Sequence, residues 1–523
     1  MPTAYETPLI LRADANARIG IGHLMRSLAL AQTWRSLGGH AILATTGSAD
    51  NLPHSVQSGE IELASLPSSY PDPADISAVL GLLQKWPKPW VCCDGYDFDS
   101  GYTQLLSREA RGVVVIDDRA HQKFYRADVI VNQNIFAERL KYNCDPSARL
   151  LLGPRYALLR REFLQWANSR GTAVDRAKRV LVSMGGGDPD NQTLKVLRSL
   201  RRLQVSDLEV KAIVGLHNPH YEQLRTEAER PGPGRVELVY NPADIPSLMA
   251  WADIAISAGG STCWELCFMG VPILVMELID NQTGVVEGLA DAGVAVNVGH
   301  FQNVTEDLLT RKIGNLLYDR DKRQSLSSSA RRLVDGRGAT RVCRVLRGES
   351  EDELCLRQAT IQDAALLFEW RNEPAVRASA LKQNSFSFDS HLEWLKSKLE
   401  SPSNVIWILE CDGRSVGAIR YDRVGECAEI DIVISAGFRG KGLGSKLLDL
   451  SAAEACRVLG VNCLVGIVKE DNPASRNAFK KSGFQEVGSL QHGSITCFRY
   501  ERTLEKLNGR DDFASRIEEN RQA

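Results

Sequence analysis

At 523 residues the chain is too long for one hydrophobic core, so two or three domains are expected. Hydrophobic residues make up 43% and charged residues 24%, as in ordinary soluble proteins, and the net charge of -2 gives no reason to expect nucleic acid as a partner. No apolar run reaches the roughly 18–20 residues of a membrane span, and no secretory signal precedes the first strand. The lack of such a run gives no reason to expect a membrane partner, and the twelve cysteines, which show no zinc-type spacing, favour a reducing cytoplasm.

Short β-branched runs alternate with amphipathic stretches from the start of the chain to about residue 345. Such alternation predicts an α/β fold with parallel sheets covered by helices. Because this length exceeds one sheet, we expect two doubly wound, Rossmann-like halves at residues 1–168 and 169–347, with the crossover at 167–178. Expected strands are 9–12, 91–94, 113–117, 128–132, 180–183, 212–214, 254–257 and 273–276, and expected helices are 23–37, 191–200 and 303–317.

An acidic run at residues 348–353 is the expected linker to a smaller α+β domain at 354–505. A hairpin is expected around Asp412 and Gly413, between strands 406–411 and 415–421. A strand at 428–435, a helix at 444–459 and a strand at 463–468 should follow, and residues 506–523 form a charged tail.

The first candidate site lies where the first strand gives way to a helix. Gly20 and Gly22 allow close approach of a ligand, and the helix N-terminus offers free N–H groups to an anion. His23 in the first turn feels the positive end of the helix dipole, which favours a neutral, base-competent imidazole. A plain turn with a surface histidine is the alternative.

A second glycine-rich segment, 257–265, follows another strand and opens another helix. Its small residues suit a diphosphate, and Glu265 one turn later suits the ribose hydroxyls. Ser261 or Thr262 as a simple N-cap is the alternative, although a cap does not explain the two glycines and the acid together. The glycine run at 183–188 either lines the same cleft or makes a tight turn.

These segments resemble the two-domain fold of nucleotide-sugar glycosyltransferases and, more narrowly, the UDP-sugar hydrolases of pseudaminic acid biosynthesis. The shared segments are 12–14, 20–23, 94–96, 116–118, 152–159, 257–265 and 281–282. The resemblance implies a glycosyltransferase-like (GT-B) fold, hydrolysis of UDP-2,4-diacetamido-2,4,6-trideoxy-β-L-altropyranose, and no metal.

In that family reading His23 is the general base, while Tyr96 and Asn281 hold water and sugar. Without the resemblance, Tyr96 is also interpretable as a core residue and Asn281 as a residue that forms a turn. The residues expected to bind the UDP-sugar are Arg12, Asp14, Gly20, Gly22, Ser257, Gly259, Gly260, Ser261, Thr262, Glu265 and Gln282.

In the last third, a glycine turn between a strand and a helix resembles the pyrophosphate loop of GNAT acetyltransferases, and residues 472–484 resemble their closing helix. The resemblance implies acetyl-CoA as cosubstrate. The residues expected to bind it are Ile432, Val433, Ile434, Arg439, Gly440, Lys441, Gly442, Leu443, Gly444, Asn472, Ser475 and Phe479.

The proton chemistry of this domain stays open. Many GNAT enzymes have a tyrosine at the position of Phe479 that protonates the thiolate, and phenylalanine cannot do so. Glu429 and Asp431 are candidate bases, with plain surface charges as the alternative. The segments 370–372 and 391–394 resemble the GNAT branch that acetylates amino sugars and protein amino groups, and with a sugar acceptor they belong to the acceptor pocket. Helix packing is the alternative for their tryptophans.

Together the two parts predict a bifunctional enzyme that acetylates UDP-4-amino-4,6-dideoxy-β-L-AltNAc and then hydrolyses the product. Its partners are the small-molecule UDP-sugar and acetyl-CoA. A UDP-sugar-dependent glycosyltransferase fused to an acetyltransferase is one alternative. A degenerate binding module that regulates the other domain is the second.

Overall fold

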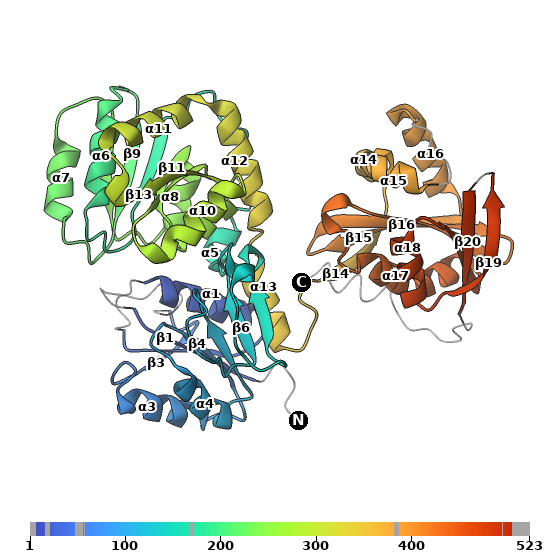
Figure 1. Ribbon diagram of the computed structural model, residues 1–523, viewed down its shortest axis with the longest axis horizontal. Helices are drawn as coiled ribbons and strands as arrows, with labels where there is room; N and C mark the ends of the chain where they lie inside the picture. The colour runs from blue at the N-terminus through green and yellow to red at the C-terminus, as the bar shows by residue number, and fades with distance from the viewer. Residues whose placement is uncertain are drawn as a thin grey trace. The chain divides into compact units, whose positions relative to one another are not determined.

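The computed structural model describes residues 7–15, 21–47, 56, 58–167, 171–380, 386–493 and 495–504. Gly20 and the expected tail at 506–523 lie outside this part of the chain. The chain divides into two compact units after Glu351 (Figure 1). None of the described helices is long and apolar enough to cross a membrane.

The first sheet of the first unit is parallel throughout, as predicted. Its order is β3 (Glu62–Ser65), β2 (Ala41–Thr45), β1 (Leu9–Ala13), β4 (Trp90–Asp94), β5 (Gly112–Ile116), β6 (Val129–Asn132) and β7 (Arg149–Leu152). Its helices include α1 (Gly22–Ser36), α3 (Pro73–Leu83) and α4 (Ser100–Glu109). The strand order reverses between β1 and β4, the point at which such sheets bind ligands.

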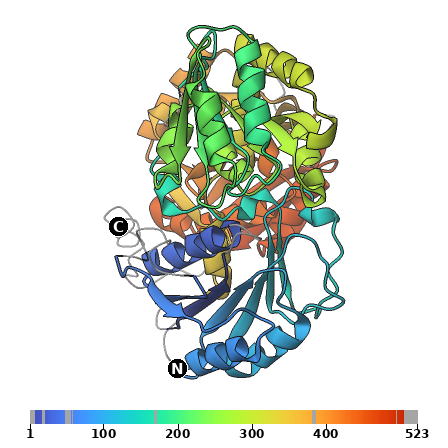
Figure 2. The same cartoon turned by 90° about the vertical axis from the view of Figure 1, so that its left-hand side faces the viewer.

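A second parallel sheet repeats this plan. Its order is β10 (Arg235–Tyr240), β9 (Glu209–Val214), β8 (Arg179–Ser183), β11 (Ile254–Ala258), β12 (Ile273–Glu277) and β13 (Ala295–His300). Its helices are α6 (Gln192–Arg202), α7 (Tyr221–Glu229), α8 (Ile245–Trp251), α9 (Thr262–Met269), α10 (Thr283–Asp291), α11 (Glu306–Tyr318) and α12 (Arg320–Leu333). Figure 2 shows helices on both faces of the sheets. Here the order reverses between β8 and β11.

The boundaries between the halves differ from those predicted. Ala157, Leu159 and Phe163 already pack into the core of the second half, ahead of the expected crossover, and α5 (Arg161–Leu164) carries the last of these. The final helix α13 (Gly338–Leu346) returns to the first half, where Val342 and Leu346 pack in the core beside α1 (Figure 1). An amphipathic helix needs an apolar partner, and its sequence does not say which core supplies it.

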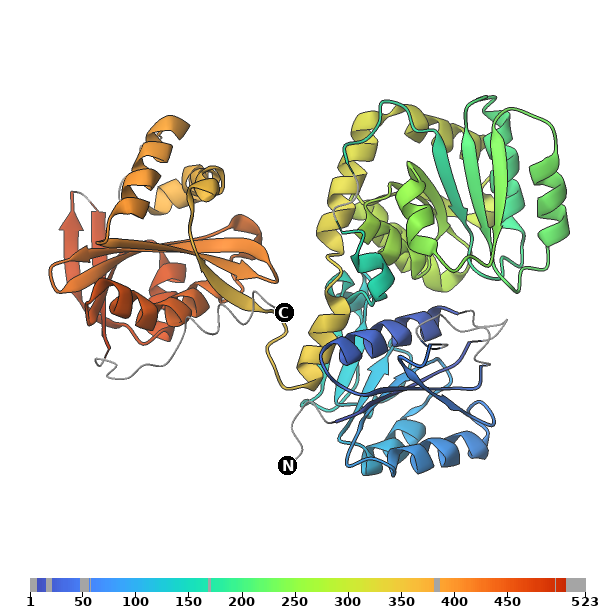
Figure 3. The ribbon, with the colours of Figure 1, turned by 180° about the vertical axis from the view of Figure 1, so that it is seen from behind.

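The second unit is an α+β domain around a seven-stranded sheet. The strand order is β14 (Leu354–Gln358), β15 (Asn404–Cys411), β16 (Arg414–Val424), β17 (Cys427–Ile434), β18 (Cys463–Lys469), β20 (Ile495–Thr503) and β19 (Gln485–His492). Helices α14 (Ala364–Asn372), α15 (Pro374–Ser379) and α16 (Phe388–Glu400) lie on one face, and α17 (Leu443–Leu459) and α18 (Pro473–Lys481) on the other (Figure 3). The expected hairpin is present, with Asp412 and Gly413 at φ 53° and 72°.

Pairing between β17 and β18 stops halfway along β17. The two strands are parallel neighbours only from Cys427 to Ile430, opposite Cys463 to Gly466. The backbone of Ile432 to Ile434 therefore has no ladder partner on its β18 side.

The close packing of α13 predicts the effect of one added methyl group. A Cβ at Gly338 would lie 2.3 Å from the carbonyl oxygen of Ala157, so backbone has to move. We expect Gly338→Ala to lower the melting temperature of the first unit by about 2–6 °C, because overpacking costs about 1–3 kcal/mol. Calorimetry measures it, with Gly81→Ala as control, since a Cβ at this helical glycine meets nothing within 4 Å. An equal effect of both substitutions would contradict the packing of α13.

Candidate active sites

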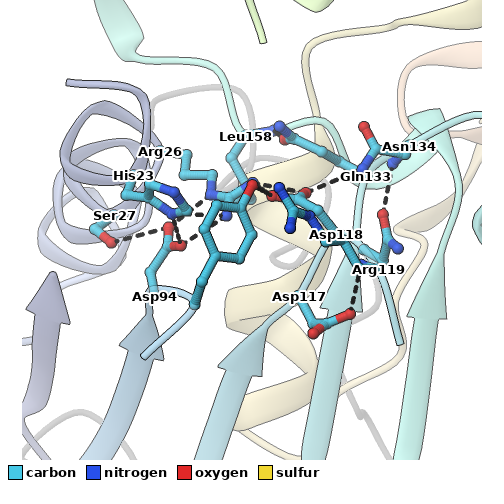
Figure 4. Close-up of polar contacts among 12 residues, drawn as sticks. His23, Arg26, Ser27, Asp94, Asp117, Asp118, Arg119, Gln133, Asn134 and Leu158 are labelled. Atoms are coloured by element: carbon cyan, nitrogen blue, oxygen red, sulfur yellow. Dashed lines mark hydrogen bonds and ion pairs between the residues drawn. The ribbon is translucent and has the colours of Figure 1, made fainter. Parts of the chain in front are cut away.

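His23 stands in the first turn of α1 and faces the end of β4. Its Nδ1 lies 2.6 Å from Oδ1 of Asp94, and both side chains are buried (Figure 4). Because an ionised carboxylate only accepts hydrogen bonds, the Asp94 contact favours the tautomer with its proton on Nδ1 and its lone pair on Nε2, whereas Arg26 Nη2, which can only donate, also lies 3.0 Å from Nδ1. This is the arrangement of a histidine oriented as a general base.

Arg26, one turn further along α1, joins two carboxylates from neighbouring strands. Its Nε and Nη2 donate to Asp94 at 2.6 and 2.7 Å, and its Nη1 donates to both oxygens of Asp118 at 2.9 and 3.0 Å. Burial opposes the ionisation of Asp118, but the guanidinium outweighs it and lowers the pKa of Asp118 to about 2. Arg26 was not predicted from the sequence.

Tyr96 lies beside the histidine, as the predicted site requires. Its ring meets the His23 ring edge to face at 4.8 Å, and its hydroxyl donates to Asp118 at 3.1 Å. Burial and the Asp118 charge raise the pKa of Tyr96 to about 12, so the phenol stays protonated near neutrality. The guanidinium of Arg119 lies 4.4 Å from the centre of the same ring.

Arg12 and Asp14 form a buried network behind this site. Arg12 is fully buried, with Nη2 2.6 Å from Asp14 and Nε 2.8 Å from Asp75 on α3. Asp14 also accepts from the backbone N–H and the hydroxyl of Thr46, at 3.0 and 2.9 Å. The structure therefore places Arg12 as a support for the end of β1, and a direct contact with a UDP-sugar stays an untested prediction.

The glycine-rich loop of the second half leaves backbone N–H groups open. Ser257 is buried and donates to the carbonyl of Ala258, and no side chain caps the start of α9. A Cβ at Gly260 would meet nothing within 4 Å. Ser261 is exposed, and a Cβ at Gly22 would lie 3.4 Å from its hydroxyl, so the N-terminus of α1 approaches this loop. Gly259 packs under Gln282 and Val286.

An arginine reaches the loop from the connection between the halves. Nη2 of Arg160 lies 3.8 Å from Oε1 of Glu265, and its Nε is buried without a hydrogen-bond partner. Burial raises the pKa of Glu265 against the opposing effect of Arg160. Arg160 was missed from the sequence, although it directly follows the family-like segment 152–159.

Of the two predicted residues after β12, one accepts a hydrogen bond with its side-chain oxygen and the other does not. Gln282 accepts the backbone N–H of Leu278 at 3.0 Å, whereas Oδ1 of Asn281 is buried without a partner. In the earlier glycine run, Asp188 accepts the N–H groups of Gln192 and Thr193 at 2.8 and 2.9 Å and caps α6, which supports the turn interpretation.

The absence of a metal stays a prediction. Glu277, Asp280 and His300 bring three potential ligand atoms within 4.8 Å of one another. No residue of the His23 site belongs to that group.

In the second unit the predicted acetyl-CoA loop has the backbone of an anion site. Gly440 and Gly442 have φ of 77° and 74°, a Cβ at either would meet nothing within 4 Å, and α17 begins at Leu443. Glycines with positive φ at every second position before a helix turn successive backbone N–H groups toward one point. Lys441 and Gly444 belong to the same turn. Arg439 instead donates to the carbonyl of Ile434 at 2.9 Å and pairs with Glu373.

Phe479 is a packing residue in the structure. It is buried, its ring lies where a Cβ of Gly466 would be 2.2 Å away, and Tyr500 stacks on it at 5.7 Å. Asn472 caps α18 by accepting the N–H of Ser475 at 3.1 Å. These contacts hold the closing helix, and direct contacts of the three predicted residues with acetyl-CoA stay untested.

The two candidate bases have different surroundings. Asp431 pairs with Arg371 at 2.9 Å and Arg420 at 3.1 Å, and although burial opposes it these cations lower its pKa. Glu429 is exposed. Both arginines also lie over the ring of Trp394, at 5.1 and 5.2 Å. Trp370 belongs to the core under α14, as the packing alternative predicts.

Two family models match the chain, in the order that the fold suggests. Residues 182–336 match the glycosyltransferase family 28 C-terminal domain. Residues 353–485 match the acetyltransferase (GNAT) domain. The chain is thus an α/β protein with a glycosyltransferase-like pair of Rossmann-like halves, followed by a GNAT domain.

Individual relatives narrow this description. The UDP-2,4-diacetamido-2,4,6-trideoxy-beta-L-altropyranose hydrolase of Campylobacter jejuni is 24% identical over 293 residues, which are 55% of this chain and 98% of that protein. Spore coat polysaccharide biosynthesis protein SpsG of Bacillus subtilis is 28% identical over 243 residues, 46% of this chain and 71% of that protein. An uncharacterized protein of Methanocaldococcus jannaschii is 21% identical over 486 residues, 91% of this chain and 96% of that protein. The predicted resemblance to the hydrolase and the predicted GNAT domain are therefore confirmed.

The ion pair of Asp118 predicts a pH-dependent contribution to stability. Its pKa is about 2 in the folded protein, below the ordinary value, so the contribution is full above about pH 4 and is lost as the pH falls towards 2. We expect Asp118→Asn to cost about 2 kcal/mol of unfolding free energy at neutral pH, and the difference to shrink below pH 4. Urea midpoints between pH 2 and 7 measure it. Asp97→Asn, at an exposed carboxylate nearby, is the control; a pH-independent difference would contradict the ion pair.

Proposed function

We propose that the chain is a bifunctional nucleotide-sugar enzyme of pseudaminic acid biosynthesis. The second unit acetylates UDP-4-amino-4,6-dideoxy-β-L-AltNAc with acetyl-CoA. The first hydrolyses the resulting UDP-2,4-diacetamido-2,4,6-trideoxy-β-L-altropyranose to UDP and the free sugar. One observation carries the hydrolase assignment. The His23–Asp94 pair lies where the strand order of the first sheet reverses, and Gly22, at the start of the same helix as His23, approaches Ser261 at the point where the strand order of the second sheet reverses.

In the proposed hydrolysis, His23 Nε2 takes a proton from water as the water oxygen bonds to the anomeric carbon. The bond from that carbon to the diphosphate oxygen breaks, and UDP leaves with the electron pair. The open amides from Gly260 to Thr262 receive the diphosphate, while the Gly259 N–H is held by the carbonyl of Met276. Arg160, 3.8 Å from Glu265, adds a positive charge there, and Glu265 accepts hydrogen bonds from the ribose hydroxyls. Asp94 is a positioning residue that keeps the proton on Nδ1.

Tyr96 and Asn281 complete the proposed site from either half. The protonated Tyr96 hydroxyl is oriented by Asp118 next to the His23 ring. Asn281 offers a buried oxygen without a partner. Each holds water or sugar and neither transfers the proton.

The proposed acetyl transfer begins with attack of a neutral amine on the thioester carbonyl. The amine nitrogen bonds to the acyl carbon, the carbon–sulfur bond breaks, and CoA leaves as thiolate. In this proposal the edge of Ile432 to Ile434 that has no partner in β18 holds the pantetheine arm, and the loop from Arg439 to Gly444 holds the pyrophosphate. The released proton passes to solvent, since Asp431 is engaged by two arginines.

The match to the glycosyltransferase family 28 model supports a second candidate, transfer of the sugar to an acceptor. Incubation with the UDP-4-amino sugar and acetyl-CoA separates the two. Release of CoA and then of UDP without an added acceptor supports hydrolysis. UDP release that depends on an acceptor supports the transferase, and CoA release alone leaves only the second unit as an enzyme.

The role of His23 predicts a loss of turnover without a loss of binding. We expect His23→Ala to reduce the rate of UDP release by about 10²–10⁴-fold, the usual contribution of a general base. UDP affinity, measured by calorimetry, should not change, because the diphosphate site lies on the second half. His40→Ala, at a partly exposed histidine of the same half, is the control. Near-normal turnover of His23→Ala would refute the assignment.

The proposed pyrophosphate loop predicts that a substitution in it weakens the binding of acetyl-CoA and of no other substrate. A Cβ at Gly442 both strains a positive φ, at about 1 kcal/mol, and projects into the open anion site. We expect Gly442→Ala to raise the KM for acetyl-CoA at least tenfold, as measured by CoA release.

Gly425 supplies a matched control, since its φ is 62° and a Cβ there also meets nothing within 4 Å. Gly425→Ala tests backbone strain alone and should leave the KM unchanged. Equal KM values for the two variants would contradict the placement of the cosubstrate.

A further inference from the structure

Helix α15 of the second unit is held at both ends by cations from other segments. At its start the carboxylate of Glu373 accepts hydrogen bonds from both Nη groups of Arg439, at 2.8 and 2.5 Å. At its end the carbonyl of Ala378 accepts one from Nζ of Lys469 at 2.7 Å. None of the six residues of the helix is buried, so packing contributes little to its position.

The two cations belong to the ends of neighbouring strands. Arg439 follows β17, and its Nε donates to the carbonyl of Ile434, the last residue of that strand, at 2.9 Å. Lys469 is the last residue of β18. These are the two strands whose pairing stops at Ile430 and Gly466. Helix α15 therefore spans the open end of the gap between them, beside the edge of β17 to which the proposed function assigns the pantetheine arm.

The two attachments differ in how easily they break. Lys469 is 4% exposed, and in the part of the chain that the structure describes its ammonium group has no ion-pair partner. Loss of the Ala378 carbonyl would leave a buried cation without its acceptor, which is costly. The side chains of Arg439 and Glu373 are instead 36% and 27% exposed, and ion pairs open to water add little stability. The start of α15 is thus the end that can be released.

Arg439 also belongs to the loop to which the proposed function assigns the pyrophosphate. A guanidinium binds a carboxylate and a phosphate through the same pairs of donors, so the two anions compete for it. A pyrophosphate in this loop would also repel the carboxylate of Glu373. We infer that Glu373 and the cosubstrate compete for Arg439, so that cosubstrate binding releases the start of α15 and opens the gap between β17 and β18 to the acceptor amine.

This inference rests on the proposed function, from which it takes the position of the pyrophosphate. It differs in sign from a purely structural role of the ion pair. A pair that only supported the loop would favour cosubstrate binding, and its removal would weaken that binding. A pair that competes with the pyrophosphate opposes binding, and its removal strengthens it.

The first test measures the affinity of the full-length protein for CoA by calorimetry. Glu373→Gln keeps the size of the side chain and removes its charge, and we expect it to lower the Kd for CoA about two- to fivefold, the range set by an ion pair open to water. Glu454→Gln is the matched control, because it removes a two-bond ion pair with Arg457 on α17 that does not involve the loop. Its Kd should not change. An unchanged or raised Kd for Glu373→Gln would overturn the inference.

The second test follows α15 itself by hydrogen exchange, with and without CoA. The reporting amides are those of Arg377 and Ala380, which donate to the carbonyls of Glu373 and Val376. In the unaltered protein CoA should make their exchange at least about twofold faster, because the start of the helix is released. In Glu373→Gln exchange should already be fast, and CoA should not change it.

The two tests separate this inference from the proposed function. CoA that binds the unaltered protein but slows the exchange of α15, or leaves it unchanged, would overturn the inference and leave the acetyltransferase assignment intact. An unaltered protein that binds no CoA would overturn the proposed function of the second unit instead.

Discussion

The first unit depends on one cation between two acids. Parallel strands end at the same edge of a sheet, so Asp94, the last residue of β4, and Asp118, two residues after the neighbouring strand β5, come close together. Two buried carboxylates would repel each other, and the cost of burying them would be several kcal/mol. Arg26 offsets this repulsion because its guanidinium hydrogen-bonds to both carboxylates. These bonds also hold α1 over the point where the strand order of the sheet reverses. His23 belongs to the same helix and is oriented as a result.

The two halves contribute opposite chemistry to the cleft. The first contributes acids, a histidine and a protonated phenol, which suit proton removal from water. The second contributes open backbone N–H groups at a helix start, which suit an anionic leaving group. Separation of the base from the anion site allows each to be preformed, since a phosphate beside Asp94 and Asp118 would be repelled. Arg160, in the connection between the halves, adds a cation on the anion side.

The local parts of this arrangement were predictable from the sequence. Strands, glycine turns and the histidine are set by residues close to one another in the chain, so their patterns can be read directly. Arg26 could not be found in this way, because its partners lie 68 and 92 residues away. Arg12 shows the same limit: its segment predicts ligand binding, which stays untested, whereas its buried contact with Asp75 on α3 joins residues 63 apart and could not be predicted from the sequence.

The course of the chain between the halves was the least predictable part of the fold. Composition locates a polar stretch at 167–178, but the core changes earlier, at residues whose apolar character fits either core. The return of α13 is of the same kind. The helix has an apolar face, but the core against which it packs depends on the fit of the two surfaces, including the contact of Gly338 with the backbone near Ala157.

The proposed acetyl transfer does not need a proton from the position of Phe479, whose side chain has none to donate. A thiol has a pKa near 8.5, so a thiolate is a tolerable leaving group at neutral pH and need not be protonated as it departs. The amine, in contrast, has to be neutral before it attacks. Arg371 and Arg420 lie on the proposed acceptor face, where Asp431 pairs with both and Asp422 pairs with Arg420, so their charges are compensated. In the proposed transfer the demand for proton chemistry thus moves from a dedicated acid at the thiolate to the removal of a proton from the amine.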